Sequence, residues 1–173
     1  MFFALMISVL MGGELGPPVG SAIPETERFE AMMGDDGATI VFVRSVSWCP
    51  FCKRQVKDLA AEASSFSEAG KPLIVVSYDA PPLQRKFADR NALTVSFLSD
   101  EGSQVIRAFG LLNESHDPSS RVYGIPHPAV FVVDRNGVVQ AKLYESDYAS
   151  NSKSYRNRPA VETILAAVRG ADS

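Results

Sequence analysis

The two cysteines of the chain, Cys49 and Cys52, are separated by two residues, a spacing typical of redox-active thiols. A dithiol that cycles needs one thiol ionised near neutral pH and a second thiol close enough to displace whatever the first has bonded to. Pro50 suits the first position of a helix, which places Cys49 at the N-cap. The free N–H groups and the dipole at that end of a helix stabilise a thiolate. We therefore predict that Cys49 is the exposed, attacking thiolate and that Cys52 is the shielded, resolving thiol.

Basic side chains near the pair fit the same chemistry. Lys53 and Arg54 lie one turn into the predicted helix, where their positive potential favours a thiolate. Arg44, which precedes the pair, is a third candidate. We expect these three cations to give electrostatic support to Cys49.

Apolar patterns predict the elements that must position the dithiol. Residues 39–44 and 73–77 are continuous apolar runs rich in β-branched side chains, typical of strands buried on both faces of a parallel sheet. Between them, a helix is predicted from residues that recur at helical spacing, namely Cys52, Val56, Leu59, Ala63 and Phe66. The dithiol then lies at the strand-to-helix junction of a βαβ unit.

The rest of the chain continues this alternation. The pattern predicts a helix after Pro82, a strand at 95–98, a helix at 103–109 and a loop at 113–124. After this loop it predicts a β-hairpin, with strands 129–133 and 138–143 around a turn at 134–137, and a last helix that ends before Gly170. The polar residues 144–158 are expected to form a solvated loop that leads into this helix. The predicted fold class is α/β, with a central mixed β-sheet flanked by helices.

Composition limits both the architecture and the partners. The chain has 173 residues, enough for one domain with a full core, and 46% of them are apolar. Seventeen basic and 20 acidic residues give a net charge of −3, so no basic footprint for nucleic acid is present.

The N-terminus has the features of an export signal except for its charge. Residues 2–11 are nearly all apolar, too few to span a bilayer, and Gly20, Ser21 and Ala22 fit a cleavage site. No Lys or Arg occurs before Arg28. We interpret residues 1–22 as either a signal peptide or an N-terminal extension, and 23–173 as the domain. The protein is exported or periplasmic in the first case and cytoplasmic in the second.

A metal site is a competing interpretation of the dithiol. Two cysteines at this spacing form half of many zinc sites, but a second pair of ligands is then required. The two histidines, His116 and His127, are separated by ten residues instead of three to five, and each by itself is expected to be a surface or loop residue. We therefore predict neither a metal nor a cofactor.

Six short segments occur in a fixed order along the chain: VFVR at 41–44, WCPFC at 48–52, VVSYD at 75–79, FLSD at 97–100, AFG at 108–110 and GIPHPAVFVVD at 124–134. Together they resemble the peroxiredoxin-like branch of the thioredoxin superfamily, the AhpC/TSA group, over nearly the whole chain. The resemblance implies a thioredoxin-like fold with the peroxiredoxin-type insertion between the βαβ unit and the closing hairpin. It also implies that Pro128 is a cis-proline facing the dithiol. The candidate substrate groove then comprises Trp48, Pro50, Phe51, His127 and Pro128.

The chain departs from the peroxiredoxin pattern Pro-x-x-x-Thr/Ser-x-x-Cys. Counted back from Cys49, the hydroxyl and proline positions are Val46 and Phe42; counted back from Cys52, they are Cys49 and Ser45. The family's arginine near the later strand is replaced by a proline. These differences favour disulfide exchange over peroxide reduction.

The main functional hypothesis is therefore a thiol–disulfide oxidoreductase that cycles the dithiol of Cys49 and Cys52. The alternative is a thiol-dependent peroxidase that reduces hydroperoxides through a sulfenic acid on Cys49. A metal-binding module that uses both cysteines and one histidine is the third. The expected partners are protein or small-molecule disulfides, hydroperoxides, and an electron donor of the thioredoxin or glutathione type.

Overall fold

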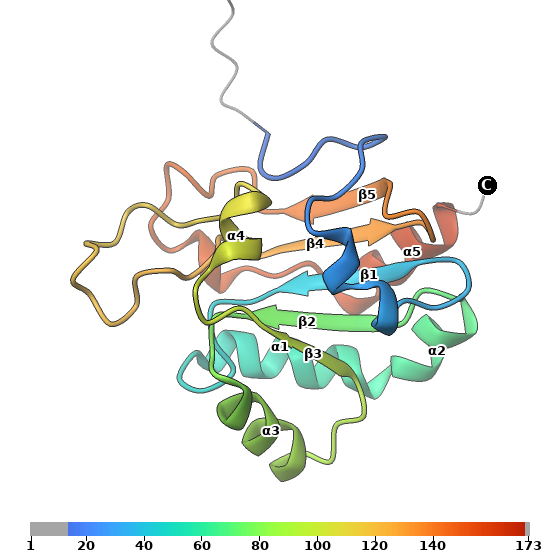
Figure 1. The fold of residues 1–173 in the computed structure, drawn as a ribbon, viewed down its shortest axis with the longest axis horizontal. Coiled ribbons are helices and arrows are strands. Elements are labelled where there is room, and N and C mark those ends of the chain that lie inside the picture. The colour runs from blue at the N-terminus through green and yellow to red at the C-terminus, as the bar shows by residue number, and fades with distance from the viewer. Residues whose placement is uncertain (1–13, 172–173) are drawn as a thin grey trace, which may run out of the picture.

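A five-stranded mixed sheet forms the centre of the protein (Figure 1), whose computed structural model describes residues 14–171. The strands lie in the order β3-β2-β1-β4-β5. The three strands β1, β2 and β3 are parallel, whereas β4 runs antiparallel to both β1 and β5. The strand bounds are β1 Ala38–Phe42, β2 Leu73–Ser77, β3 Ser96–Ser99, β4 Ala129–Val133 and β5 Val139–Tyr144. The predicted mixed sheet is confirmed.

Helices cover both faces of this sheet (Figure 1). The α-helices are α1 Pro50–Ala61, α2 Ala63–Glu68, α3 Pro81–Arg90, α4 Gln104–Ala108 and α5 Val161–Gly170. Three 3-10 helices are η1 Thr26–Arg28, η2 Glu30–Met32 and η3 Ser154–Arg156. Successive residues of a strand point to opposite faces, so Val41 packs with α1, α2 and α5, whereas Ile40 and Phe42 pack with α4. The two faces therefore carry separate apolar cores.

Two predicted elements differ substantially from the structure, whereas the bounds of β3, α4 and β5 differ from the expectation by one residue. The first strand ends at Phe42 instead of residue 44, because Phe42 pairs with Ala129 and the next residue of β4 outward is Pro128, which has no N–H to donate. The single predicted helix over 52–66 is broken at Glu62, so α1 and α2 are separate. The apolar spacing continues across this break, which is why the pattern did not detect it.

The predicted hairpin turn is confirmed and has a clear chemical basis. Asp134 Oδ1 accepts hydrogen bonds from the backbone N–H groups of Asn136 and Val138, at 2.8 and 2.9 Å. Gly137 has φ +76°, in the left-handed region that favours glycine. This turn sets the pairing of β4 with β5.

The segment before the first 3-10 helix is hydrogen-bonded to this hairpin. The N–H of Gly20 donates to the carbonyl of Val139 at 2.8 Å, and Leu15 is buried. The apolar run 2–11 lies outside the described residues, so the boundary between residues 22 and 23 stays a prediction. Within residues 14–171, no helix has the length and apolar character needed to cross a membrane.

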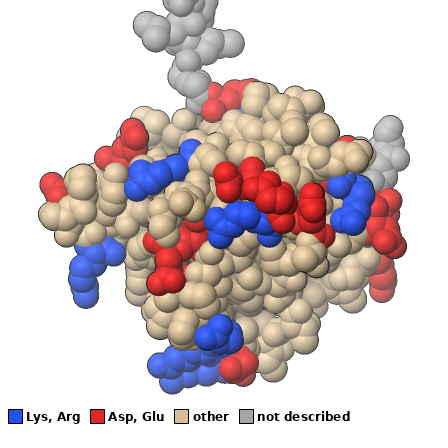
Figure 2. Space-filling view, in the orientation of Figure 1, with Lys and Arg blue, Asp and Glu red and all other residues tan. Residues whose placement is uncertain are grey.

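Charged side chains of both signs are interspersed on the face drawn in Figure 2. Basic side chains gather at the end of the molecule where α3 lies. There Lys86 and Arg90 line a groove together with Lys53 and Lys57 of α1.

Candidate active site

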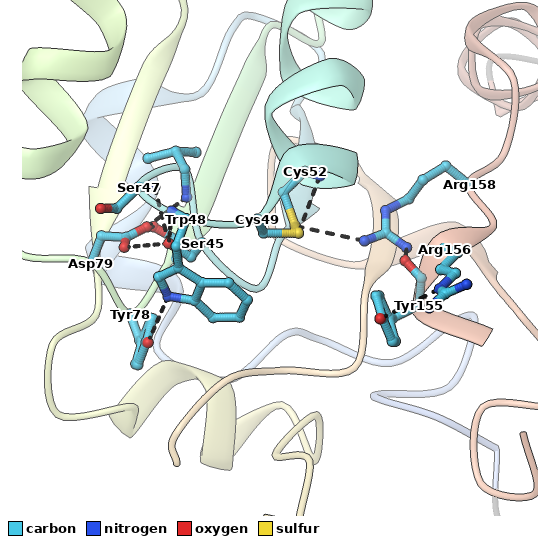
Figure 3. The surroundings of a disulfide bond; sticks show 12 residues. Ser45, Ser47, Trp48, Cys49, Cys52, Tyr78, Asp79, Tyr155, Arg156 and Arg158 are labelled. Carbon is cyan, nitrogen blue, oxygen red and sulfur yellow. Dashed lines mark hydrogen bonds between the residues drawn. A yellow bond between two sulfur atoms is a disulfide. The ribbon is translucent and has the colours of Figure 1, made fainter. Parts of the chain in front are cut away.

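The two cysteines form a disulfide at the N-terminus of α1 (Figure 3). Cys49 is the N-cap, as predicted, and its Sγ accepts a hydrogen bond from the N–H of Cys52 at 3.3 Å. Pro50 occupies the first turn, where a missing N–H costs nothing. The helix end therefore presents the N–H of Cys52 to the sulfur of Cys49.

Both sulfur-bearing residues are buried in this oxidised state. Cys49 and Cys52 are each 0% exposed, so the predicted exposure of Cys49 is wrong for the disulfide form, whereas the predicted shielding of Cys52 is confirmed. The two aromatic neighbours remain at the surface: Trp48 is 39% exposed and Phe51 is 36% exposed. Only a small reagent, or a movement of the covering side chains, gives access to the sulfurs.

An arginine from the far end of the chain contacts the dithiol. Arg158 Nη2 lies 3.6 Å from Cys52 Sγ, and Nη1 donates to the carbonyls of Tyr155 and Asn157 (Figure 3). Burial and the neighbouring charge of Arg44 lower the pKa of Arg158 to about 10, so it is protonated at neutral pH. Residues 144–158 are thus more than the solvated loop predicted from their polarity. No local pattern indicated this contact, which joins residues 106 positions apart.

The other cations divide into one that lies in the site and two that lie outside it. The guanidinium of Arg44 stacks on the ring of Tyr155 at 3.9 Å and lies 5.0 Å from the ring of Trp48. Its burial lowers the pKa of Arg44. The backbone N–H of Lys53 donates to the carbonyl of Cys49 at 3.0 Å, but within the described residues no side-chain hydrogen bond joins Lys53 or Arg54 to either cysteine. Their predicted support for Cys49 is therefore at most long-range, and it stays a prediction.

A buried carboxylate accepts hydrogen bonds from the loop that precedes Cys49. Asp79 is 4% exposed and accepts three hydrogen bonds of 2.7 Å, from Ser45 Oγ, Ser77 Oγ and the N–H of Val46. Ser45 Oγ in turn accepts from the backbone N–H of Trp48 at 3.2 Å. The residues just before Cys49 are therefore oriented through Asp79, whose role sequence reasoning missed although it ends one of the family-like segments.

The indole of Trp48 is also held from the neighbouring strand end. Its Nε1 donates to the hydroxyl of Tyr78 at 3.0 Å, and that hydroxyl donates to the carbonyl of Arg121 at 3.2 Å (Figure 3). Burial raises the pKa of Tyr78, which keeps its hydroxyl neutral. The indole is thus kept beside the dithiol in one orientation.

The predicted substrate groove is divided in the structure. His127 and Pro128 line a cavity of about 580 Å³ together with Arg44, Tyr155 and Arg158. Trp48, Pro50 and Phe51 do not line it. The expected cis-proline is wrong as well, because every peptide bond among residues 14–171 is trans.

Histidine protonation gives a testable pH dependence. Burial lowers the pKa of His127, and the nearby His116 lowers it further. The unfolded chain therefore takes up a proton at about pH 6.5 that the folded protein does not, so the free energy of unfolding falls as the pH falls through this value. We expect His127→Gln to reduce this slope in urea denaturation. In NMR titration the ring protons of His127 should titrate below pH 6.5; a higher midpoint would contradict the burial argument.

The described part of the chain contains no group of three or more His, Cys, Asp or Glu side chains placed to hold a metal ion.

The comparison with known proteins decides the family. The AhpC/TSA family model matches residues 25–142, more than half of the chain. The protein belongs to the AhpC/TSA family. The resemblance stated from six short segments is therefore confirmed.

Relatives of this AhpC/TSA protein include peroxiredoxins. Chloroplastic peroxiredoxin Q of Gentiana triflora is 29% identical over 109 residues, which are 63% of this chain and 47% of that protein. Peroxiredoxin Bcp of Escherichia coli strain K12 is 24% identical over 131 residues, which are 76% of this chain and 83% of that protein. The chain thus spans about half the length of the chloroplastic relative.

A solved structure supports the fold independently of sequence. Peroxidoxin BcpB from Mycobacterium tuberculosis superposes with a TM-score of 0.68 at 17% identity, over 91% of this chain and 98% of that chain. At this identity the likeness concerns the fold alone. The thioredoxin-like α/β fold predicted for this AhpC/TSA protein is confirmed.

Proposed function

We propose that this protein is an oxidoreductase of the thiol-dependent peroxidase type, in which Cys49 and Cys52 cycle between dithiol and disulfide. The observation that carries the proposal is the buried disulfide at the N-terminus of α1, with Arg158 Nη2 at 3.6 Å from Cys52 Sγ. Membership of the AhpC/TSA family, together with relatives named peroxiredoxins, supports a hydroperoxide as the oxidant. This reverses the order of the two sequence-based hypotheses.

The chemistry assigns a role to each cysteine. The Cys49 thiolate attacks one oxygen of the hydroperoxide, the O–O bond breaks, and the alcohol or water leaves with a proton. The Cys52 thiol then attacks the Cys49 sulfenic acid, forms the disulfide and releases water. An external thiol returns the pair to the reduced state. The N–H of Cys52, at 3.3 Å from Cys49 Sγ, stabilises the thiolate before the attack.

The missing hydroxyl of the peroxiredoxin pattern has a candidate substitute. Val46 stands at the position three residues before Cys49, and its aliphatic side chain has no hydrogen-bond donor. The guanidinium of Arg158 comes from a different part of the chain and points at the dithiol. Its charge can take the role of polarising a bound peroxide.

Disulfide exchange with a protein is the second candidate function. Trp48 and Phe51 are exposed apolar side chains next to the dithiol, and such rims suit docking of a partner protein. This function needs no peroxide-polarising hydroxyl, which agrees with Val46.

The single tryptophan provides the test. Trp48 adjoins Cys49, so stopped-flow fluorescence of the reduced protein should report oxidation by hydrogen peroxide. A fully ionised Cys49 has on the order of 30-fold more thiolate at pH 7 than a free thiol of pKa about 8.5. We therefore expect a rate more than about tenfold above that of free cysteine at the same pH.

The controls separate the two candidate functions. Cys49→Ser should remove the fast phase, whereas Arg85→Gln, at an exposed position on α3, should not. A wild-type rate equal to that of free cysteine would contradict peroxidase activity and leave disulfide exchange.

A further inference from the structure

The cavity beside the dithiol has the size and lining of a small-molecule site. Its volume of about 580 Å³ lies within the roughly 300–1,000 Å³ typical of ligand pockets. Residues 110–116 form one wall and residues 145–158 form another. Arg158 belongs to its lining and also contacts Cys52 Sγ, so the cavity and the sulfur share one side chain.

Two arginines of this cavity have unused hydrogen-bonding capacity. The Nε atoms of Arg44 and Arg158 are buried and have no hydrogen-bond partner. Neither guanidinium makes an ion pair within residues 14–171. Arg44 contacts the faces of two aromatic rings and interacts with the side chain of Tyr155, which leaves its unpaired Nε–H to bind an acceptor. Buried donors are nearly always paired, so this arrangement suits a site that is completed by an anion.

Among the charged groups that line the cavity, only the two arginines are available to bind an anion. Burial lowers the pKa of both His116 and His127, so the imidazoles are mostly neutral at pH 7. Glu145 is half-buried, and it acts on Arg158 without forming an ion pair. Glu114 is exposed at the rim.

The uncharged lining indicates what else the ligand carries. Six small polar residues line the cavity: Asn113, Ser115, Ser150, Asn151, Ser152 and Ser154. Hydroxyl and amide groups hydrogen-bond peptide-like atoms and give little contact to a long acyl chain. Together with the apolar Leu15, Leu112 and Pro128, these groups give the cavity the mixed lining that suits a small peptide-like molecule.

We propose that this cavity binds the reducing thiol of the cycle, a small peptide-like thiol whose carboxylate is held by Arg44 and Arg158. The assignment rests on the proposed function, because it needs the disulfide as an intermediate. Both sulfurs are buried and neither cysteine lines the cavity, so the covering side chains must move before the reaction. The thiolate of the ligand then attacks Cys52 Sγ, a new S–S bond forms, and Cys49 leaves as a thiolate. A second ligand thiolate attacks the ligand sulfur of this mixed disulfide and releases Cys52. Two thiols thus give two electrons and two protons to the pair and leave as one disulfide.

The test compares an acid with its ester on the whole protein. Glutathione and glutathione diethyl ester carry the same thiol, but the ester has no free carboxylate. We expect the oxidised protein, followed by Trp48 fluorescence, to be reduced at least about tenfold faster by glutathione, since a charged hydrogen-bonded pair is typically worth this much or more. Equal rates for acid and ester would overturn the proposal.

Variants locate the preference in the cavity. Arg158→Gln and Arg44→Gln should each lower the acid-to-ester ratio to less than about threefold, whereas Arg85→Gln should leave it unchanged. The ratio compares two thiols on one protein, so a general loss of reactivity does not affect it. If Arg158→Gln does not fold, Arg44→Gln and the wild-type comparison still decide. A ratio that survives in both variants would overturn the assignment to these arginines.

Two further measurements distinguish the other outcomes. The first compares the rates at which a carboxylated hydroperoxide and its methyl ester oxidise the reduced protein. If the acid reacts faster than the ester here, but glutathione and its ester react equally, the cavity binds the oxidant and the proposal is overturned. Oxidation of the reduced protein by hydrogen peroxide tests the proposed function alone. Fast oxidation without any acid–ester difference contradicts only the carboxylate site, whereas slow oxidation with a thiol preference contradicts only the peroxidase.

Discussion

Replacing Cys52 by serine is expected to leave one round of peroxide oxidation at Cys49 and to stop disulfide formation. In Cys52→Ser the sulfenic acid on Cys49 has no resolving thiol, so it persists and can be captured by a dimedone-type reagent. Mass spectrometry should then find one adduct per chain, on Cys49. In Cys49→Ser the rate of reaction with hydrogen peroxide should fall on the order of 100-fold or more, as when the nucleophile of a catalytic unit is removed.

The structure defines the specific result that would reverse this assignment. Arg158 contacts Cys52 Sγ, whereas Cys49 Sγ accepts the N–H of Cys52 at 3.3 Å, so each sulfur has a group that stabilises a thiolate. A dimedone adduct on Cys52 in Cys49→Ser, with none on Cys49 in Cys52→Ser, would make Cys52 the attacking thiol. An adduct in neither variant would contradict the sulfenic acid route itself.

Removing the Asp79 carboxylate is expected to produce the largest loss of stability that the site offers. Asp79→Ala leaves the hydroxyls of Ser45 and Ser77 and the N–H of Val46 without their buried acceptor. Hydrogen bonds to a charged group contribute about 1.5–3 kcal/mol each, and partial relaxation reduces their sum, so we expect a loss of about 3 kcal/mol. For a chain of this size that corresponds to a decrease in Tm of roughly 6–12 °C.

The same substitution should also affect the chemistry. The loop before Cys49 depends on Ser45, which Asp79 holds, so its loosening should slow oxidation of the folded variant by hydrogen peroxide. Asp79→Asn keeps an acceptor and should lose less stability than Asp79→Ala. Asp89→Ala, at an exposed position on α3, is the matched control and should stay within about 0.5 kcal/mol of wild type. A similarly small change in Asp79→Ala would show that the network contributes little.

Local patterns were sufficient to predict most elements of this fold. The strand over Ala129–Val133 and the hairpin turn after it follow from a continuous apolar run and from turn chemistry, which act between neighbours in the chain. Cys49 at the N-cap followed from Pro50 and the helical spacing after it. The break between α1 and α2 was missed because apolar spacing carries no information about backbone angles at Glu62.

The family assignment also depended on the sequence alone, because short segments in a fixed order are a property of the chain. The side chains that surround the two sulfur atoms could not be predicted from short sequence segments. Arg158, Tyr155 and Asp79 lie far from Cys49 in sequence, and only the packing of residues 144–158 and the end of β2 brings them to the dithiol.

The sequence by itself therefore determined the dithiol, its place at a helix start and the family. The tertiary structure decided that both sulfurs are buried, that the bond before Pro128 is trans, and that a distant arginine supplies the charge beside Cys52. The physical reason is the distance along the chain over which each kind of interaction acts. Capping and periodicity act within a few residues, whereas burial and ion contacts depend on which distant segments share a face of the sheet.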